Sequence, residues 1–328
     1  MLGELAPFDA PRVSVWMITY NQERYIEEAV RSVLAQEVNF DVEIVIGEDC
    51  STDGTREILL RLQAIYPTRI RLLLNDKNVG MIANQNLTFR ECRGEFIAML
   101  EGDDYWSDSS KLEKQVAALE SHPGSDICFH PVEVVGKKRL MSNHSSQPCM
   151  FSMSDVIKGG GYFCPTPSLM LRRNVVGGWP DFLDSAPAGD YYLQMLGAVR
   201  GGAVYLPDVM AAYRLDAVGS WSLSIKVFEK KQSFRLRTLD MLDKMDHFFC
   251  FAYSKPISEK KFEVALMVAF DYLYHGRSEE FSACYKLVQG MSAKRTYHYH
   301  VVNILRFFPS ILRTIYFGLK LCRNARMR

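Results

Sequence analysis

Three carboxylates within four residues are the sharpest chemical feature of the sequence. Glu101, Asp103 and Asp104 come directly after an apolar segment at residues 95–100. Carboxylates at this spacing repel one another unless a cation lies among them. Oxygen-only ligands with an open coordination shell suit Mg²⁺ or Mn²⁺, which also bind phosphate oxygens. A surface loop that caps the helix after Asp108 is the alternative interpretation, and the motif alone does not decide between the two.

The segments around this motif predict the elements that must position it. Four apolar segments rich in β-branched residues predict strands at residues 12–19, 42–47, 70–74 and 95–100. Helical patterns fall between them, at residues 22–36, 55–65 and 84–92. Alternating strands and helices indicate a parallel sheet with right-handed crossovers, and therefore an α/β fold.

Polar clusters follow three of these predicted strands. The clusters are Tyr20–Asn21, Glu48–Asp49 and Glu101–Asp104. Ligands of open parallel sheets bind beyond the carboxyl ends of the strands. One acidic cluster after a strand is commonplace, whereas three polar clusters at three strand ends indicate one shared site.

The pattern after the acidic motif is less regular. Residues 111–120 predict a helix, residues 126–135 a single strand and residues 136–150 a polar loop. Residues 203–213 are strand-like but are interrupted by Pro207, and the pattern is helical from about residue 223 to the end.

Several of these motifs resemble, in order, those of the family 2 glycosyltransferases. The N-terminal ones are Thr19-Tyr20-Asn21, Glu48-Asp49-Cys50-Ser51-Thr52-Asp53-Gly54-Thr55, Asn78-Val79-Gly80 with Asn86, and Leu100-Glu101-Gly102-Asp103-Asp104-Tyr105-Trp106. Asp190 stands where the family places its catalytic base, and Tyr213-Arg214 resembles a late donor-site motif. The resemblance covers residues 10–222. It implies a Rossmann-like GT-A nucleotide-sugar-binding fold. With the patterns above, we expect a mainly parallel central sheet in this fold and a helical C-terminal extension after it.

The resemblance also implies roles for individual residues. Asp190 would take the proton from the acceptor hydroxyl as it attacks in line, which inverts the anomeric centre. Asp104 would be the metal ligand, and Asp103 would face the ribose or the metal. The nucleotide-sugar site would comprise Thr19, Tyr20, Asn21, Glu23, Glu48, Asp49, Ser51, Asn78, Gly80, Met81, Asn84, Glu101, Gly102, Asp103 and Arg214, with Tyr20, Glu48 and Asp49 on the base.

The sequence departs from the family pattern at three positions. Glu48 and Glu101 stand where many relatives have Asp, and Asp216 stands where a His often follows Tyr213-Arg214. An Asp can ligate a metal through oxygen, so Asp216 is a further candidate ligand. The Gln-x-x-Arg-Trp motif of processive polymer synthases is not present in the sequence.

Some candidates have simpler interpretations beside the functional one. Asp190 could cap the helix that it opens. Thr166 and Ser168 could line an acceptor site, and Arg172-Arg173 could contact diphosphate or end a strand in solvent. Trp106 is expected to pack inside the protein rather than on a sugar.

Composition and charge indicate the compartment of the protein and the partners that it lacks. The 328 residues are 48% hydrophobic and 23% charged, with a net charge of +1 and eight scattered cysteines. The cysteines predict reduced thiols in a cytoplasmic protein. We expect neither a secretory signal nor a membrane-spanning helix, and no nucleic-acid partner.

The C-terminal end is basic and apolar. Beyond Glu280 no acidic residue occurs, and residues 297–322 mix bulky apolar side chains with Arg and Lys. This pattern predicts an amphipathic helix on an anionic membrane surface, which would place the protein at the inner face of the cell membrane. The alternative is a helix docked on the main domain or on another subunit of a homo-oligomer.

We therefore expect two domains and one activity. Residues 1–222 would form the GT-A domain, and residues 223–328 a helical region with a basic tail. The enzyme would use Mn²⁺ or Mg²⁺ to move a sugar from a UDP-sugar to a glycan or lipid-linked acceptor in surface polysaccharide (O-antigen or capsule) synthesis. A sugar nucleotidyltransferase, and a non-catalytic sugar-binding protein on a decayed transferase fold, are the alternatives.

Overall fold

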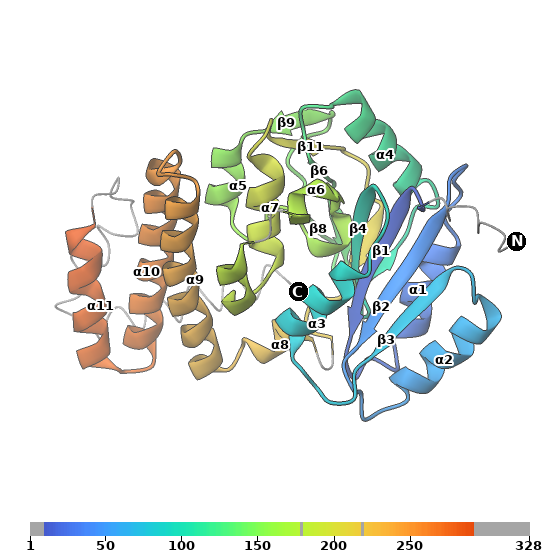
Figure 1. The fold of residues 1–328 in the computed structure, drawn as a ribbon. Helices are drawn as coiled ribbons and strands as arrows, with labels where there is room; N and C mark the ends of the chain where they lie inside the picture. Colours follow the sequence, from blue (N-terminus) through green and yellow to red (C-terminus); the bar gives the residue numbers. More distant parts are fainter. Residues whose placement is uncertain (1–9, 178–179, 218–219, 292–328) are drawn as a thin grey trace, which may run out of the picture. The chain divides into compact units, whose positions relative to one another are not determined.

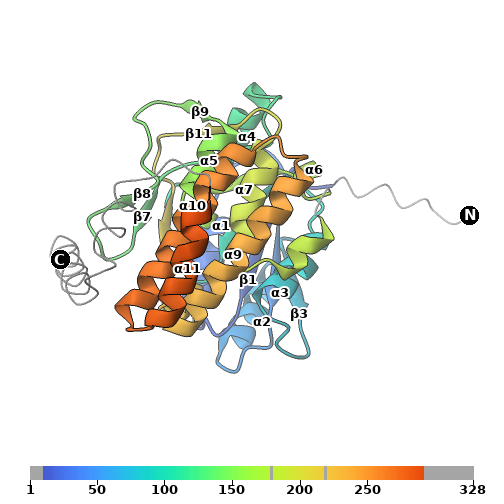
Figure 2. The same ribbon diagram turned by 90° about the vertical axis from the view of Figure 1, so that its left-hand side faces the viewer.

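A computed structural model describes residues 10–177, 180–217 and 220–291, and it is shown in Figures 1 and 2. The chain divides into two units, residues 1–223 and residues 224–328. The predicted basic tail at residues 297–322 lies outside the described residues.

An eight-stranded sheet forms the centre of the first unit, in the order β3-β2-β1-β4-β10-β6-β11-β9. Its strands are β1 (Val13–Thr19), β2 (Val42–Glu48), β3 (Ile70–Leu74), β4 (Phe96–Glu101), β6 (Ile127–Phe129), β9 (Cys149–Phe151), β10 (Met170–Arg172) and β11 (Ala203–Tyr205). The first four run parallel and lie side by side in Figure 1, whereas β10 is antiparallel to both of its neighbours. The expected α/β fold with a mainly parallel central sheet is confirmed.

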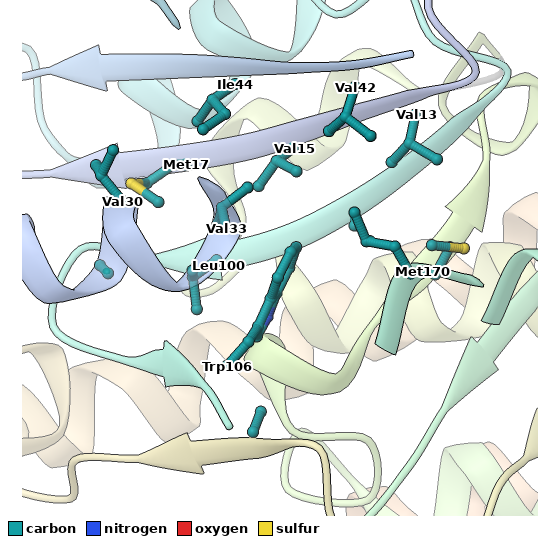
Figure 3. Packing of buried hydrophobic residues seen from close by; sticks show 14 of the residues in the cluster. Val13, Val15, Met17, Val30, Val33, Val42, Ile44, Leu100, Trp106 and Met170 are labelled. Carbon is teal, nitrogen blue, oxygen red and sulfur yellow. The ribbon is translucent and has the colours of Figure 1, made fainter. Parts of the chain in front are cut away.

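Helices cover both faces of the parallel strands. They include α1 (Ile26–Leu34), α2 (Thr55–Ile65), α3 (Met81–Arg90) and α4 (Lys111–Ser121). Side chains alternate along a strand, so Val15 and Met17 of β1 point to one face and Trp16 to the other. Val30 of α1 packs on the first face (Figure 3). On the opposite face Trp16 contacts Phe89 of α3, with ring centroids 5.3 Å apart.

A second sheet of four short strands lies next to the acidic motif. Its order is β5-β12-β7-β8, with β5 (Tyr105–Trp106), β12 (Ala211–Tyr213), β7 (Val132–Val134) and β8 (Leu140–Met141). β5 follows the acidic motif directly and pairs antiparallel with β12, where Tyr105 lies opposite Ala212. This pairing brings Arg214, which follows β12, to the acidic motif.

The prediction of a single strand at residues 126–135 is wrong, and so is the prediction of a loop at residues 136–150. The first segment forms β6 and β7, which belong to different sheets and are separated by His130-Pro131. Proline has no N–H to donate to a strand ladder, which explains the break at this point. The second segment contains β8 and β9, both at sheet edges, where short strands are common.

The remaining elements of the first unit lie between β9, β10 and β11 of the eight-stranded sheet. They are α5 (Met153–Gly159), η1 (Thr166–Ser168), α6 (Asn174–Gly177), η2 (Asp181–Ser185) and α7 (Asp190–Ala198). Each residue of α7 from Tyr191 onward is buried. The helix that begins with Asp190 is therefore a core element.

Three helices make up the described part of the second unit. They are α9 (Phe228–Phe248), α10 (Ser254–Tyr274) and α11 (Ser278–Gly290), packed side by side in chain order, and the short α8 (Trp221–Ser224) precedes them. Phe262, Leu266 and Phe281 belong to their apolar core. The helical region expected from about residue 223 is confirmed as far as residue 290. Within the described ranges, no helix is both long and apolar enough to cross a membrane.

We expect Gly47→Ala to destabilise the protein by about 1–3 kcal/mol, because β2 and α3 are too close for a methyl group. A Cβ at this position would lie 2.5 Å from Asn84 Oδ1 and would also overlap Thr88 Oγ1. The shift of the thermal unfolding midpoint measures this effect. Gly124→Ala is the matched control, because a Cβ there meets nothing within 4 Å. Equal midpoints for the two variants would contradict the close packing.

Candidate active site

The register of the parallel strands brings the three predicted polar clusters to one place. Thr19 of β1 lies opposite Glu48 of β2, and Ile18 lies opposite Glu101 of β4. Gly102 continues this edge, because its N–H donates to the Ile18 carbonyl at 3.1 Å. A Cβ on Gly102 would lie 2.8 Å from Thr19 Oγ1, so this approach requires glycine. Local strand pairing therefore fixes where the acidic motif begins.

Glu101, Asp103 and Asp104 form a cluster whose ligand oxygens all lie within 4.8 Å of one another. Asp104 is almost fully buried, and its Oδ1 accepts the Arg214 backbone N–H at 2.7 Å. Its Oδ2 is buried and has no hydrogen-bond partner in the described part of the chain. A buried carboxylate oxygen without a partner is costly, and a cation would satisfy it. The three carboxylates therefore fit a divalent metal ion.

Burial raises the pKa of each carboxyl in this cluster. The pKa of Glu101 rises to about 8, because of burial first and then the charges of Asp103 and Asp190. Burial raises the pKa of Asp103 to about 6, although the positive charge of Arg214 opposes the rise. The pKa of Asp104 is raised by burial and by both neighbouring carboxylates. A bound cation would hold all three groups ionised at neutral pH.

The Arg214 side chain positions the acidic motif through contacts within the protein. Its Nη1 donates to the Asp103 carbonyl at 2.7 Å, and its Nη2 pairs with Glu28 at 2.6 Å. The guanidinium carbon lies 5.0 Å from the ring centroid of Tyr25 and 4.7 Å from that of Tyr105. The side chain is thus fixed by contacts within the protein. Its predicted contact with the donor stays a prediction, and its observed role is to position the motif.

Asp190 lies at the start of α7, close enough to Glu101 for its charge to raise the Glu101 pKa. Its Oδ1 accepts the Tyr191 backbone N–H at 2.8 Å, and its Oδ2 accepts a hydrogen bond from Thr166 Oγ1 at 3.3 Å. The N-cap residue of α7 is Gly189, so Asp190 is the first helical residue rather than the cap. Burial raises the pKa of Asp190. A carboxylate with a raised pKa is a stronger base, which suits proton abstraction.

Asp216 does not join the carboxylate cluster in the described part of the chain. It follows β12 with a positive φ of 67°, and its backbone N–H donates to Ser222 Oγ at 3.0 Å. Its role as a metal ligand stays a prediction.

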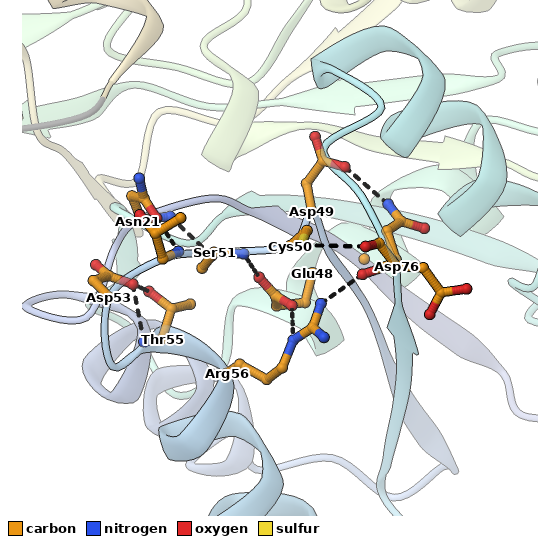
Figure 4. A network of polar contacts seen from close by, with 12 residues as sticks. Asn21, Glu48, Asp49, Cys50, Ser51, Asp53, Thr55, Arg56 and Asp76 are labelled. Carbon is orange, nitrogen blue, oxygen red and sulfur yellow. Dashed lines mark hydrogen bonds and ion pairs between the residues drawn. The ribbon is translucent and has the colours of Figure 1, made fainter.

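Several residues predicted to bind the nucleotide join two turns to one another (Figure 4). Their contacts with a nucleotide stay predictions. Asn21 Oδ1 accepts the Thr52 N–H at 2.8 Å, and Ser51 Oγ accepts the Asn21 N–H at 3.0 Å. Glu23 accepts the Gly54 N–H at 2.8 Å. Glu48, fully buried, accepts the Ser51 N–H at 2.6 Å and forms an ion pair with Arg56. These bonds fix the β1–α1 and β2–α2 turns in one rigid edge of the site.

Asp49 orders the segment that leads into α3. Its carboxylate accepts the backbone N–H groups of Val79 at 2.8 Å and of Gly80 at 2.9 Å. Gly80 has a φ of 87°, a conformation that favours glycine. The buried Asn84 donates to the Gly47 carbonyl at 2.9 Å. Asp49 and Asn84 thus shape this loop, and their contacts with a ligand stay predictions.

Other predicted residues remain accessible. Tyr20 is 38% exposed at the end of β1, Asn78 is exposed, and Met81 is partly buried at the start of α3. An accessible ring at a strand end is available to a flat ligand such as a base. Gln22 and Arg56 did not stand out in the sequence. Gln22 accepts a hydrogen bond from Thr19 Oγ1 at 2.7 Å, and this contact has no local sequence signal.

Comparison with known proteins agrees with this geometry. Residues 14–178 match the model of the family described as "Glycosyl transferase family 2". An uncharacterised protein of Mycobacterium tuberculosis is 39% identical over 216 residues, which are 64% of this chain and 60% of the relative. The chain therefore spans less than two thirds of that relative.

Two characterised proteins are more distant. The Escherichia coli protein WfgD, named UDP-Glc:alpha-D-GlcNAc-diphosphoundecaprenol beta-1,3-glucosyltransferase, is 28% identical over 181 residues, which are 55% of this chain and 67% of WfgD. The crystal structure of Staphylococcus aureus TarS (residues 1–349) with UDP-GlcNAc superposes with a TM-score of 0.55. It covers 85% of this chain and 90% of that one at 17% identity, which is a likeness of fold.

We expect Asp104→Asn to stabilise the metal-free protein at neutral and mildly alkaline pH, because it removes a carboxyl whose ionised form is costly in a buried, repulsive cluster. A gain of about 1 kcal/mol would raise the thermal unfolding midpoint by about 2–4 °C. The same variant should lose the stabilisation that Mn²⁺ gives the native protein. Asp41→Asn, at an exposed acid, is the control. A destabilised metal-free variant that still responds to Mn²⁺ would refute the cluster's role.

We also expect pH to act on the metal-free protein and on Mn²⁺ binding in opposite directions. Because the carboxyl pKa values are raised on folding, the stability of the metal-free protein falls as the pH rises from the ordinary carboxyl range through about 8. Mn²⁺ affinity rises over the same range, and binding releases protons. Titration calorimetry in two buffers of different ionisation enthalpy measures the Mn²⁺ affinity and the number of protons released on binding. A Mn²⁺ affinity that does not change between about pH 6 and about pH 8 would contradict the raised pKa values of Glu101 and Asp103.

Proposed function

The chain belongs to glycosyl transferase family 2, and on this premise we propose that it is a metal-dependent, inverting glycosyltransferase. It transfers a sugar from a nucleotide diphosphate-sugar to an acceptor hydroxyl. The observation that carries the proposal is the buried Asp104 Oδ2, which has no hydrogen-bond partner among the described residues. It belongs to a carboxylate cluster that lies near Asp190. This arrangement combines a cation site with a base.

Asp104, Asp103 and Glu101 are the residues that would hold the metal. When bound, a divalent cation supplies Lewis-acid stabilisation of the negative charge on the leaving diphosphate. The backbone N–H of Arg214 holds Asp104 Oδ1 and leaves Oδ2 for the cation. Because Arg214 also binds the Asp103 carbonyl, the motif is ordered before any ligand arrives. Such preorganisation reduces the ordering that binding requires.

Asp190 acts as the general base. The acceptor oxygen forms a bond to the anomeric carbon while the bond from that carbon to the phosphate oxygen breaks. The acceptor proton moves to Asp190, and the nucleoside diphosphate leaves. A single displacement of this kind inverts the anomeric centre. Thr166 and the Tyr191 N–H each hold one oxygen of Asp190, which fixes the carboxylate for this transfer.

The donor and acceptor follow from what the comparisons support. WfgD is named for UDP-glucose and TarS was solved with UDP-GlcNAc, which favours a UDP-sugar as the donor. The name of WfgD includes a lipid diphosphate acceptor. We extend this to a lipid-linked glycan as the acceptor here, in surface polysaccharide synthesis at the inner face of the cell membrane. The match to a sugar-transferring family weighs against a nucleotidyltransferase.

We expect Asp190→Asn to lower turnover about 10²–10⁴-fold, because the amide cannot take the acceptor proton. UDP release from a panel of UDP-sugars, with a lipid extract as the acceptor, measures turnover. UDP with Mn²⁺ should protect the variant and the native protein equally against thermal unfolding, and GDP and CDP less.

Asp181→Asn is the control, because this acid is exposed in η2. Near-normal turnover of the Asp190→Asn variant would remove Asp190 from the role of base. If no nucleoside diphosphate protects the native protein in the presence of Mn²⁺, the proposed nucleotide-sugar site is wrong.

A further inference from the structure

We propose that Tyr162 is a stacking platform for a pyranose ring of the acceptor, beside the base Asp190. This inference rests on the proposed function and extends it to the acceptor side of the site. Tyr162 lies in the segment between α5 and η1, and its side chain is 52% exposed. Single exposed aromatic residues are common, so the case depends on how this one is held and what lies near it.

The segment that carries Tyr162 is bound to the helix that carries Asp190. Gln194 of α7 is buried, and its Nε2 donates to the Gly161 carbonyl at 3.0 Å and to the Cys164 carbonyl at 2.9 Å. These two carbonyls flank Tyr162 on both sides. Thr166, at the end of the segment, donates directly to Asp190. The position of the Tyr162 backbone is therefore tied to that of the base.

The other contacts of the segment are with residues outside α7. Ser142 Oγ donates to the Tyr162 carbonyl at 2.7 Å. The neighbouring Phe163 ring stacks on His144 at 4.3 Å between centroids and contacts Phe151 at 5.2 Å. The residues around Tyr162 are thus anchored in an aromatic cluster, whereas its own ring faces solvent. A tyrosine on an anchored backbone has only two side-chain torsions to fix when it binds a ligand.

The phenol group of Tyr162 lies within electrostatic reach of two carboxylates. Its pKa is raised by burial of the hydroxyl end first, and then by the charges of Asp190 and Asp216. Tyr162 in turn is among the groups that raise the pKa of Tyr213, next to Arg214. These electrostatic interactions agree with the hydrogen bonds that tie the segment of Tyr162 to the helix of Asp190.

A pyranose matches this combination of groups. One face of a pyranose ring presents C–H groups, which pack on an aromatic face, while its hydroxyls lie around the edge. Asp190 and Asp216 can accept hydrogen bonds from those hydroxyls, and charge-assisted bonds of this kind are strong. A sugar stacked on Tyr162 would present one hydroxyl to Asp190, which is the geometry that the transfer requires.

Saturation-transfer NMR tests this inference with methyl pyranosides of glucose, galactose, N-acetylglucosamine and mannose as the probes. The native protein, loaded with UDP and the diamagnetic Mg²⁺, should transfer saturation to the ring protons of at least one pyranoside. Tyr162→Ala should weaken that pyranoside's binding about tenfold, which corresponds to about 1.4 kcal/mol. Tyr162→Phe keeps the ring and should retain most of the binding. Leu60→Ala, at an exposed apolar position of α2, is the control.

Two results would overturn the inference. One is unchanged pyranoside binding by the Tyr162→Ala variant, and the other is no saturation transfer from the native protein to any of the probes. Protection by UDP and Mn²⁺ should be the same for the native protein and Tyr162→Ala. If that protection is present, a failed pyranoside experiment counts against the acceptor platform alone. If it is missing from the native protein, the proposed function fails instead.

Discussion

Uncompensated negative charge is the constraint on which this molecule depends. Glu101, Asp103 and Asp104 are brought together by strand pairing and by a glycine that no other residue can replace without overlap. Folding thereby places carboxylates where water cannot solvate them fully, and one buried oxygen remains without a partner among the described residues. Such strain persists only where the surrounding structure enforces it, and it is typical of functional sites. The protein is complementary to a cation before one is bound.

Different residues position the acidic motif and carry out the proposed chemistry. Arg214, sandwiched between two tyrosine rings, and the small sheet that delivers it hold the acidic motif. Glu48 and Asp49 hold the turns at the neighbouring strand ends. Residues that fix backbone in this way need not touch a ligand to be essential, because a displaced motif would no longer match its substrate. In the proposed function, the chemistry itself falls to the cation site and to Asp190.

The sequence predicted the first half of the fold well, because β1 to β4 are buried apolar segments with clear turns between them. It failed at residues 126–135, where one apolar pattern continues across a change of sheet and only Pro131 marks the break. The acidic motif was visible because its chemistry is local. The contacts of Arg214 with Asp103 and Asp104, and of Thr166 with Asp190, were not visible, because they arise from pairing between distant segments. The sequence pattern also did not reveal that Glu48 and Asp49 bind backbone N–H groups within the protein.

The hydrogen bond between Asp104 and Arg214 joins residues that are 110 positions apart. A ribosome releases the acidic motif long before it releases the residue that orients it. A nascent chain that ends between residues 104 and 214 contains every carboxylate of the cluster but lacks the N–H that holds Asp104. The native arrangement of the cluster is thus completed only once residue 214 has been made, well after the motif itself.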